Sequence, residues 1–440
     1  MTAEIAILNK EAVALAADSA VTVMFSSANS EPSHKIFSSA NKLFALSKYA
    51  PVGMMIYGNA TFMGVPWETL IKEYRRKLDT DIFHDLKGYA QDFIKFLDGG
   101  NKFIPSSVQD EAFRDEVVSF YEYIRERIIK KYNEYLVDHK TISRKKAVEI
   151  AKSVINRDNV KFEKADSLKS LPKTFGDRLK KRYKKDIEDA IRNVFEKMPV
   201  EKDKLRKFAL WLFTKQRKEF TLPRSGIVIS GFGDKDIYPS IYSFRIDGFV
   251  TDRLIYAGEL SQKISFQSSA LIVPFAQHEM VVTFMEGIDP NYSMIVNGNL
   301  KTLLQGFTTE YTKAILDQCI KDTADRNKIA DKLLEKSGQI SSKLYGVFKK
   351  ILDEYRDSRF SRPVLGAVSS LPKDELASMA ESLINLTSFK RRVSLVQETV
   401  GGPIDVAVIS KSDGFVWIKR KRYFDKDLNP RFFANYSKKQ

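Results

Sequence analysis

Thr2 and Asp18, near the amino terminus, have side chains that could perform catalysis and a spacing that could bring them together. Residues 3–8 alternate small and apolar side chains, Asn9 and Lys10 provide a two-residue turn, and residues 12–17 form a second run of this kind. This pattern predicts a β-hairpin, whose two far ends lie side by side. We therefore expect Asp18 to lie beside Thr2, an arrangement that suits a threonine nucleophile at the start of the chain.

The chemistry of such a threonine depends on a base, because its hydroxyl is a poor nucleophile until its proton is taken. If Met1 is removed, the α-amine of Thr2 can be that base. Its ordinary pKa of roughly 7.7–8.0 lies near the working pH, where a general base performs best. Threonine is small enough at position 2 for an aminopeptidase to remove Met1. The residues then suit attack on an amide carbonyl, followed by hydrolysis of the acyl-enzyme by water.

The bulk composition limits the class of protein. A chain of 440 residues is long for one hydrophobic core, so we expect two domains or one domain with large insertions. The single cysteine, Cys319, excludes an intramolecular disulfide framework. No apolar run reaches the roughly 18 residues of a membrane span, and the amino terminus lacks a signal-peptide pattern. We expect a cytoplasmic protein with no membrane contact. The histidines have no metal-ligand spacing, and we expect no metal and no cofactor.

Strand-like and helix-like blocks alternate along the chain and predict an α+β fold. Strands are expected over 20–25, 35–38, 42–46 and 52–58, and helices over 66–77 and 81–97. The core is expected to comprise residues 1–99, 222–298 and 361–425, interrupted by helical insertions at 100–221 and 299–360 and followed by a basic tail at 426–440. This order fits two sheets packed face to face between two helical layers.

The first insertion contributes most of the excess positive charge of the chain. Residues 140–220 contain 25 Lys or Arg against 12 Asp or Glu, which accounts for 13 of the 16 net positive charges. These helices could be solvated amphipathic faces, or a docking surface for nucleic acid or an acidic protein. Interleaved acids such as Asp186, Glu188 and Asp189 favour the solvated faces.

Four stretches of the sequence resemble the proteasome β-subunit and HslV family of N-terminal nucleophile hydrolases. They are TAEIAILNKEAVALAADSAVT, SHKIF, MMIYGNATFMGVPWETLIKEYRR and GGPIDVAVISKSDGFVWI, and SGIVISGFGDKDIYPSIYSFRIDG is similar to the central hairpin of that family. The resemblance covers about half of the chain and implies a four-layer αββα sandwich. It also implies a threonine peptidase that acts on peptides or unfolded proteins, forms a homo-oligomeric ring and receives substrate from an ATP-dependent unfoldase.

The resemblance assigns roles to four residues. Thr2 matches the nucleophile of the family and Asp18 its acidic residue at the end of the second strand. Lys35 matches the active-site lysine, whose positive charge lowers the pKa of the nearby α-amine while Asp18 keeps the lysine charged and oriented. Gly58 matches the glycine whose backbone N–H stabilises the oxyanion.

The same resemblance implies a small apolar specificity pocket lined by Val21, Ile56 and Ala60. The chain also departs from the family near the terminal amine. Gln397 and Val400 stand where the family has an aspartate and a serine, and residues 275–277 replace a Gly-Ser-Gly sequence. The residues that surround the terminal amine and hold it in place are therefore expected to differ from those of the family.

Two other functions remain open on the sequence. The same fold and chemistry could cleave a small amide, as related hydrolases do. Alternatively, the chain could be a non-catalytic scaffold that binds a partner through its basic helical insertions.

Overall fold

The computed structural model describes residues 3–27, 30–37, 39–100, 103–216, 225–319, 323–394, 401–422, 424–425, 427–431 and 434. These residues form the expected α+β fold, with 55% helix and 21% strand in antiparallel sheets. The chain divides into two compact units. The first comprises residues 1–39, 264–408 and 417–423, and the second comprises 40–263, 409–416 and 424–440.

The sheet of the first unit contains the predicted amino-terminal hairpin. Its strand order is β12 (Ala270–Ala276), β1 (Ala3–Asn9), β2 (Ala12–Ala17), β13 (Asp405–Ser410) and β14 (Gly414–Lys419). The turn is formed by Lys10 and Glu11 rather than by Asn9 and Lys10. Asn9 remains in β1 because its side-chain oxygen accepts hydrogen bonds from the backbone N–H groups of Glu11 and Ala12, each at 3.0 Å.

Three helices accompany this sheet in the first unit. Helix α11 (Lys373–Val393) packs on β1 and β2, α10 (Arg362–Val368) packs on β12, and α7 (Glu279–Glu286) contacts α11. Alternate residues of the strands face these helices, because successive side chains of a strand point to opposite faces. The alanines of β2 on this face, Ala12, Ala14 and Ala16, leave room for α11 to approach closely.

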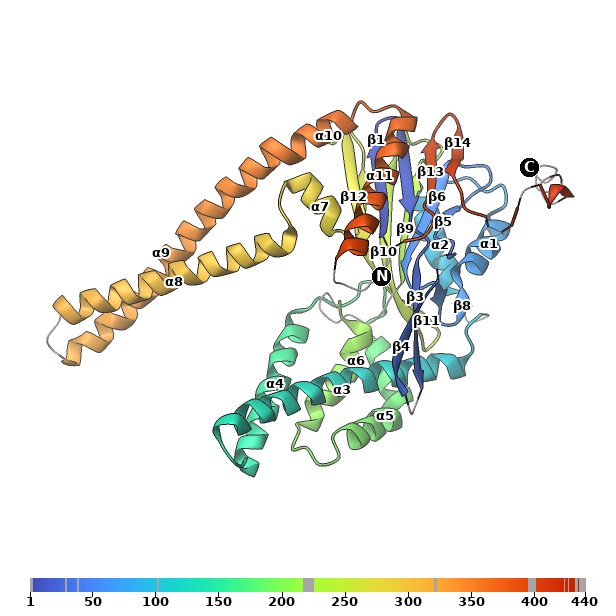
Figure 1. Cartoon of the computed structure of the whole chain (residues 1–440). Helices are drawn as coiled ribbons and strands as arrows, with labels where there is room; N and C mark the ends of the chain where they lie inside the picture. The colour runs from blue at the N-terminus through green and yellow to red at the C-terminus, as the bar shows by residue number, and fades with distance from the viewer. Residues whose placement is uncertain are drawn as a thin grey trace. The chain divides into compact units, whose positions relative to one another are not determined.

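Two long helices of the first unit form a hairpin that we call the arm. Helices α8 (Pro290–Cys319) and α9 (Thr323–Arg356) pack side by side and extend from the sheet (Figure 1). The expected boundary at residue 299 is wrong for the helix, which begins at Pro290. The Asp289 carboxylate accepts hydrogen bonds from the N–H groups of Asn291 and Tyr292, at 2.9 and 3.2 Å, and so caps the helix at this point. A π-helical turn, Asp357–Ser361, links α9 to α10.

The first unit also contains a two-stranded ribbon formed by β3 (Val21–Ser27) and β4 (Ser30–Phe37). Both strands are longer than expected, because they pair with each other from Val21 opposite Phe37 to Ser27 opposite Ser30.

The second unit has its own sheet, in the order β11 (Arg253–Lys263), β10 (Ser240–Val250), β9 (Ser225–Gly231), β6 (Val52–Gly58) and β5 (Leu43–Ala45). A short hairpin, β7 (Thr61–Phe62) and β8 (Val65–Pro66), precedes α1 (Trp67–Leu78) and α2 (Leu86–Asp98). Both helices share a buried core with β6, β9 and β10. Helix α2 begins at Leu86 rather than near residue 81, because the Asp85 side chain accepts a hydrogen bond from the Gly88 N–H at 2.9 Å and caps it there.

The described part of residues 100–221 is helical, as expected, and contains four helices. They are α3 (Ser106–Asp138), α4 (Arg144–Lys164), α5 (Phe175–Val194) and α6 (Lys202–Thr214). They enclose a separate aromatic core, in which the Phe113 ring stacks on Tyr183 and Phe213 with centroid distances of 3.8 and 4.8 Å.

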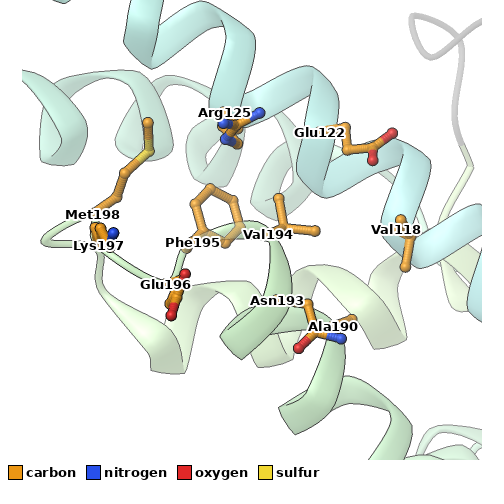
Figure 2. Close-up of a pocket in the computed structure, with 10 residues that line it drawn as sticks. All are labelled: Val118, Glu122, Arg125, Ala190, Asn193, Val194, Phe195, Glu196, Lys197 and Met198. Carbon is orange, nitrogen blue, oxygen red and sulfur yellow. The ribbon is translucent and has the colours of Figure 1, made fainter.

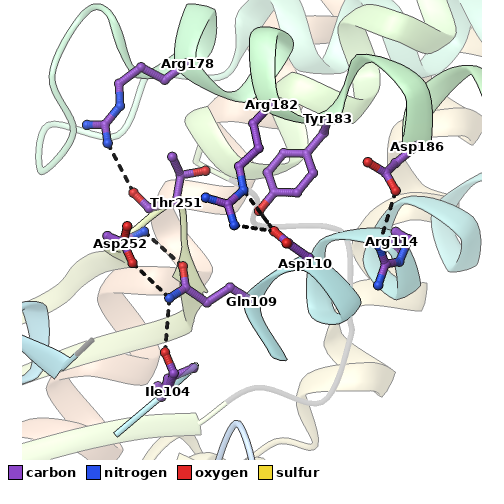
Figure 3. Close-up of polar contacts among 10 residues, drawn as sticks. All are labelled: Ile104, Gln109, Asp110, Arg114, Arg178, Arg182, Tyr183, Asp186, Thr251 and Asp252. Carbon is purple, nitrogen blue, oxygen red and sulfur yellow. Dashed lines mark hydrogen bonds and ion pairs between the residues drawn. The ribbon is translucent and has the colours of Figure 1, made fainter. Parts of the chain in front are cut away.

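The four helices are joined to the sheet of the second unit at the β10–β11 turn (Figure 3). Thr251 and Asp252 at this turn have positive φ angles of 53° and 56°, which are costly for residues other than glycine. Gln109 of α3 stabilises the turn: its side chain accepts a hydrogen bond from Asp252 N–H at 2.9 Å and donates to the Asp252 carboxylate and to the Ile104 carbonyl, each at 3.1 Å.

Replacing Gln109 by leucine is expected to lower the free energy of unfolding by about 2–3 kcal/mol, because buried polar partners lose their hydrogen bonds. Gln109 is 1% exposed, so water cannot replace it without rearrangement. Urea unfolding measures the effect. Gln91→Leu on α2, where the side chain is exposed, is the matched control and should change the value by less than about 0.5 kcal/mol. Equal effects of the two substitutions would contradict the role of Gln109.

The GFGDKD sequence after β9 is organised by one buried carboxylate, that of Asp236. It accepts hydrogen bonds from the backbone N–H groups of Leu86 and Gly233 at 2.9 Å and from Lys263 Nζ at 2.6 Å. Burial raises the pKa of Asp236, but the hydrogen bonds from Lys263, Gly233 and Leu86 outweigh it, and the pKa lies below its ordinary value of 3.8. The glycines therefore belong to a loop closed by a carboxylate.

Because its folded-state pKa is lowered, the Asp236 carboxylate is expected to stabilise the fold above pH 3.8 and to lose this contribution as the pH falls below that value. Asp236→Asn should therefore lower the free energy of unfolding by about 1–3 kcal/mol at neutral pH. The difference from wild type should shrink below about pH 4. Urea unfolding across pH 3–7 measures it, with the exposed Asp234→Asn as control. A difference that does not vary with pH would refute the ionic contribution.

Candidate active site at the start of β1

The candidate site is centred on the Asp18 carboxylate, which is 1% exposed. The hairpin register places Glu4 opposite Ala17, so that Asp18 follows directly at the end of β2 and its N–H donates to the Ala3 carbonyl at 3.1 Å. One carboxylate oxygen of Asp18 accepts a hydrogen bond from the Ala3 N–H at 3.1 Å. Asp18 therefore lies at the start of β1, bonded to Ala3, and its predicted approach to Thr2 itself stays a prediction.

The second carboxylate oxygen of Asp18 reaches a distant part of the chain. It accepts hydrogen bonds from Gly401 N–H at 3.0 Å and from Ala20 N–H at 3.4 Å. The neighbouring Ser19 strengthens this connection, because its N–H donates to the Gly401 carbonyl at 3.3 Å and its hydroxyl donates to the Pro403 carbonyl. Asp18 therefore ties the first described residue of β1 to the Gly-Gly turn that precedes β13.

The other neighbour of β1 at this end is β12, where Ala3 pairs with Ala276. Ala276 has a φ of 58°, a left-handed conformation that costs an alanine of order 1 kcal/mol or more. The next residue, Gln277, is 5% exposed and accepts a hydrogen bond at 2.6 Å from Nε of Arg391, which also binds Glu279 at 2.8 Å. An arginine at the end of α11 thus orients the segment that follows β12.

Sequence reasoning missed Arg391 and a further polar residue, Glu4, and identified Gln277 only as part of the segment that replaces a Gly-Ser-Gly sequence. Glu4 is 1% exposed although it is a carboxylate, and it lies between Ala17 on β2 and Phe275 on β12. Its position two residues after Thr2 was the signal in the sequence, because an acidic residue in an otherwise apolar strand is unusual. Arg391 had no comparable signal.

The predicted lysine, Lys35, lies in β4 opposite Val23 of the ribbon. Its side chain is exposed, and its Nζ lies 5.2 Å from the centre of the Phe37 ring. A cation over an aromatic face contributes about 0.5–1 kcal/mol at an exposed site. The predicted effect of Lys35 on the terminal amine remains a prediction.

The predicted oxyanion residue, Gly58, belongs to the second compact unit, whereas Asp18 and Lys35 belong to the first. Gly58 has a φ of 83° and ends β6 at a turn. Two side chains hold this turn: Ser225 Oγ donates to the Asn59 carbonyl at 3.2 Å and accepts a hydrogen bond from Trp67 Nε1 at 2.9 Å. Because Trp67 is fully buried, the backbone around Gly58 is firmly anchored.

The three predicted pocket residues are also divided between the units. Val21 is half-buried at the start of β3 in the first unit. In the second unit, Ile56 is 3% exposed and packs in the core beneath α1 and α2, while Ala60 is half-buried and its carbonyl accepts a hydrogen bond from the Trp67 N–H at 3.2 Å. The pocket itself remains a prediction.

Three residues on which the sequence hypothesis depends, Thr2, Gln397 and Val400, lie outside the described residues. What the structure describes at this site is therefore the support around them: Asp18, the Gly401 turn and the end of β12.

A separate cavity of about 490 Å³ lies among the helices of the second unit, between α3 and the segment that joins α5 to α6. Figure 2 shows Val118, Glu122 and Arg125 along α3, opposite the stretch from Val194 to Met198. The lining combines apolar groups with charges of both signs, and it includes none of the residues predicted to catalyse.

No protein-family model and no curated protein matches this sequence. Within the described residues, no helix is long and apolar enough to span a membrane. The same part of the chain contains no group of three His, Cys, Asp or Glu side chains placed to hold a metal ion.

Proposed function

We propose that this chain is a proteasome-like N-terminal threonine hydrolase, which cleaves peptide bonds through Thr2 after removal of Met1. The observation that carries the proposal is the attachment of Ala3 to Asp18 and, through Asp18, to the Gly401 turn. A residue that serves as both nucleophile and base must hold its hydroxyl and amine in one geometry relative to the substrate. A buried carboxylate bound to the next residue's N–H supports such a rigid position.

The burial of the first unit's sheet supports the αββα sandwich that we propose for the fold. Ala3, Ile5 and Ile7 pack in the core that includes α11. Glu4 and Leu8, on the opposite face of the same strand, are also at most 1% exposed. A sheet with helices on one face and a second buried face is typical of an inner layer of a sandwich.

In the proposed mechanism, the Thr2 hydroxyl attacks the amide carbonyl while the α-amine takes its proton. The Gly58 N–H stabilises the oxyanion, an interaction worth about 2.7–4 kcal/mol in comparable hydrolases. The protonated amine then delivers the proton to the departing amine, which leaves an ester on Thr2. Water, activated by the same α-amine, hydrolyses this ester. Lys35 favours the neutral amine through its positive charge.

The proposed substrate is a peptide or an unfolded protein with an apolar residue before the cleaved bond, held by Val21, Ile56 and Ala60. A homo-oligomeric ring, an ATP-dependent unfoldase as partner and a cytoplasmic location complete the proposal. These features follow from the resemblance to the family. Nucleic-acid binding by the basic helices is less favoured. Their acids form ion pairs, such as Glu188 with Arg206 at 2.6 Å, which lowers the pKa of Glu188.

Labelling with a threonine-directed peptide epoxyketone tests the proposal. This reagent needs both the hydroxyl and the free α-amine of an N-terminal threonine, because it closes a ring on the two groups. Intact mass is expected to show loss of Met1 and the addition of one reagent per chain, on the peptide that begins at Thr2. A chain with an uncleaved amino-terminal extension is the control and should not react.

The outcome also separates the alternatives. Retention of Met1, or no labelling of a chain that begins at Thr2, would overturn the enzymatic proposal and favour a scaffold. Labelling without cleavage of unfolded protein, together with cleavage of small amides, would assign the same site to an amidase.

A further inference from the structure

The arm formed by α8 and α9 exposes far more apolar surface than a solvated helical hairpin needs. On α8, eight large apolar side chains are 38–69% exposed: Tyr292, Met294, Ile295, Val296, Leu303, Phe307, Tyr311 and Ile315. On α9, eight more are 37–58% exposed: Ile329, Leu333, Ile340, Leu344, Val347, Phe348, Ile351 and Tyr355. Single exposed apolar residues are ordinary, but a continuous patch of this kind marks an interface.

The exposed residues follow helical stripes. On α8, Leu303, Phe307, Tyr311 and Ile315 are each four residues apart, so they lie along one side of the helix. The rings of Phe307 and Tyr311 stack within this stripe, with centroids 5.9 Å apart.

On α9, Leu333, Ile340 and Val347 repeat every seven residues, and Leu344 and Ile351 repeat with the same spacing. Apolar residues at two positions of a seven-residue repeat are typical of a helix that packs against another helix along its length.

Leu344 and Phe348 follow Ser337 and Ser341 on one side of α9, and the contact between α8 and α9 leaves these stripes more than a third exposed. The buried residues on the two helices are mainly small or polar: Thr312 is 9% exposed, Ser337 is 8% exposed and Ser341 is 1% exposed, with Leu316 at 3%. Small residues allow the two helices to approach closely, and the large apolar side chains of α9 remain 37–58% exposed beside them. The apolar stripe of α9 is therefore only partly covered within the hairpin.

We propose that the arm is a dimerisation element, which packs against the arm of a second copy of this chain as an antiparallel bundle of four helices. At roughly 100 Å² for each half-exposed large side chain, the four residues of the α8 stripe and the five of the α9 repeat offer roughly 900 Å², about the area that one partner buries in a standard stable interface. The largest apolar patch of a typical monomer is only about 300–600 Å². A second arm has the same length and the same stripes, which a two-fold contact requires.

The charges of the arm are mixed in sign. Helix α8 carries Lys301 and Lys313 against Glu310 and Asp317, and α9 carries eight Lys or Arg against five Asp or Glu. A helix that lies on a membrane surface has a polar face rich in Lys and Arg, and a nucleic-acid partner also selects basic surfaces. Acids and bases alternate along the arm instead of forming one basic face, which favours a second copy over either of these partners.

Sedimentation velocity of the full chain across a concentration series tests the proposal. Phe307→Glu combined with Leu344→Glu places a charge on each stripe, where the native side chains are 67% and 52% exposed. Wild type is expected to have at least twice the mass of this variant, whether the variant is a single chain of 50.3 kDa or the ring of the proposed function. The dissociation constant should rise by at least about 100-fold, because like charges face each other across the interface.

The matched control adds the same two charges on the other sides of the helices, at Gln305→Glu and Ser342→Glu, two residues from the stripes. It should keep the wild-type mass, and circular dichroism should show that both variants are folded.

In mixed ¹⁴N and ¹⁵N chains, a photo-crosslinker at Tyr311 should join residues 290–356 of different copies. A monomeric wild type, equal masses of the two variants, crosslinks outside the arm, or binding of a monomer to anionic vesicles would each overturn the proposal. Thr2 labelling should be unchanged in both variants, so the result is independent of the proposed hydrolase.

Discussion

Replacement of Thr2 by alanine is expected to abolish epoxyketone labelling and to lower the rate of peptide hydrolysis by roughly 10⁶-fold, the loss typical of removing a catalytic nucleophile. The alanine chain keeps a free α-amine but has no hydroxyl to attack the carbonyl. Because the substitution removes two side-chain atoms at the end of the chain, the free energy of unfolding should change little. Steady-state hydrolysis of a fluorogenic peptide, together with intact mass, measures the effect.

One conservative variant and one control variant test whether the loss is specific to the Thr2 hydroxyl. Thr2→Ser keeps the hydroxyl and the amine and should retain labelling at a reduced rate, because serine lacks the methyl group that restricts χ1. Thr302→Ala removes an exposed threonine of α8 and should leave both the labelling and the hydrolysis at the wild-type level. Hydrolysis that survives in Thr2→Ala would show that another group performs the reaction.

Replacement of Asp18 by alanine is expected to lower the free energy of unfolding by about 3–5 kcal/mol, because three backbone N–H groups lose their acceptor inside the protein. The same change should reduce labelling by at least about tenfold even at temperatures where the variant is folded. The reason is that Ala3 is released and Thr2 no longer has a fixed position relative to its substrate. Chemical denaturation and the rate of labelling measure the two effects separately.

Asp18→Asn separates these two effects. The amide keeps one acceptor oxygen but presents N–H donors to other N–H donors, so we expect an intermediate loss of stability, of about 1–3 kcal/mol. Asp331→Ala on the exposed surface of α9 is the matched control and should alter neither stability nor labelling. If Asp18→Ala lost stability but labelled at the wild-type rate, Asp18 would be a structural residue with no effect on the nucleophile.

The amino-terminal hairpin was predictable because its information is local. The alternation over residues 3–8 and 12–17 requires only neighbouring strands, and the register from Glu4 opposite Ala17 follows from a two-residue turn. The error of one residue in the turn has a physical cause: the Asn9 side chain bonds to the backbone of Glu11 and Ala12 and keeps Asn9 within the strand.

Helix starts were harder to predict where a capping residue competes with the apolar pattern. Asp289 begins α8 earlier than the expected boundary at 299, although the sequence Asp-Pro is a recognisable start signal. Asp85 begins α2 later than expected, since its carboxylate accepts the Gly88 N–H. In both regions the apolar periodicity located the helix but not its first residue.

The partners of polar side chains were beyond sequence reasoning, because residues far apart in the chain form these bonds. Gln109 bonds to Asp252, and Ser225 bonds to Asn59, across separations of 143 and 166 residues. In the sequence, a glutamine or serine that makes such a long-range bond looks the same as one on the protein surface. The choice is made by the packing of elements that the chain brings together only on folding.

Local sequence patterns were enough to predict the α+β class, the hairpin that carries Asp18 towards the start of the chain, and the helical character of the two insertions. Local periodicity decides these features, because side chains three or four residues apart share a helix face and those two apart share a strand face. The hydrogen bond between Asp18 and Gly401, 383 residues away, and the exposure of the apolar stripes of the arm became evident only in the folded structure. Such features depend on which surfaces meet after the elements have formed, and one-dimensional patterns do not specify that choice.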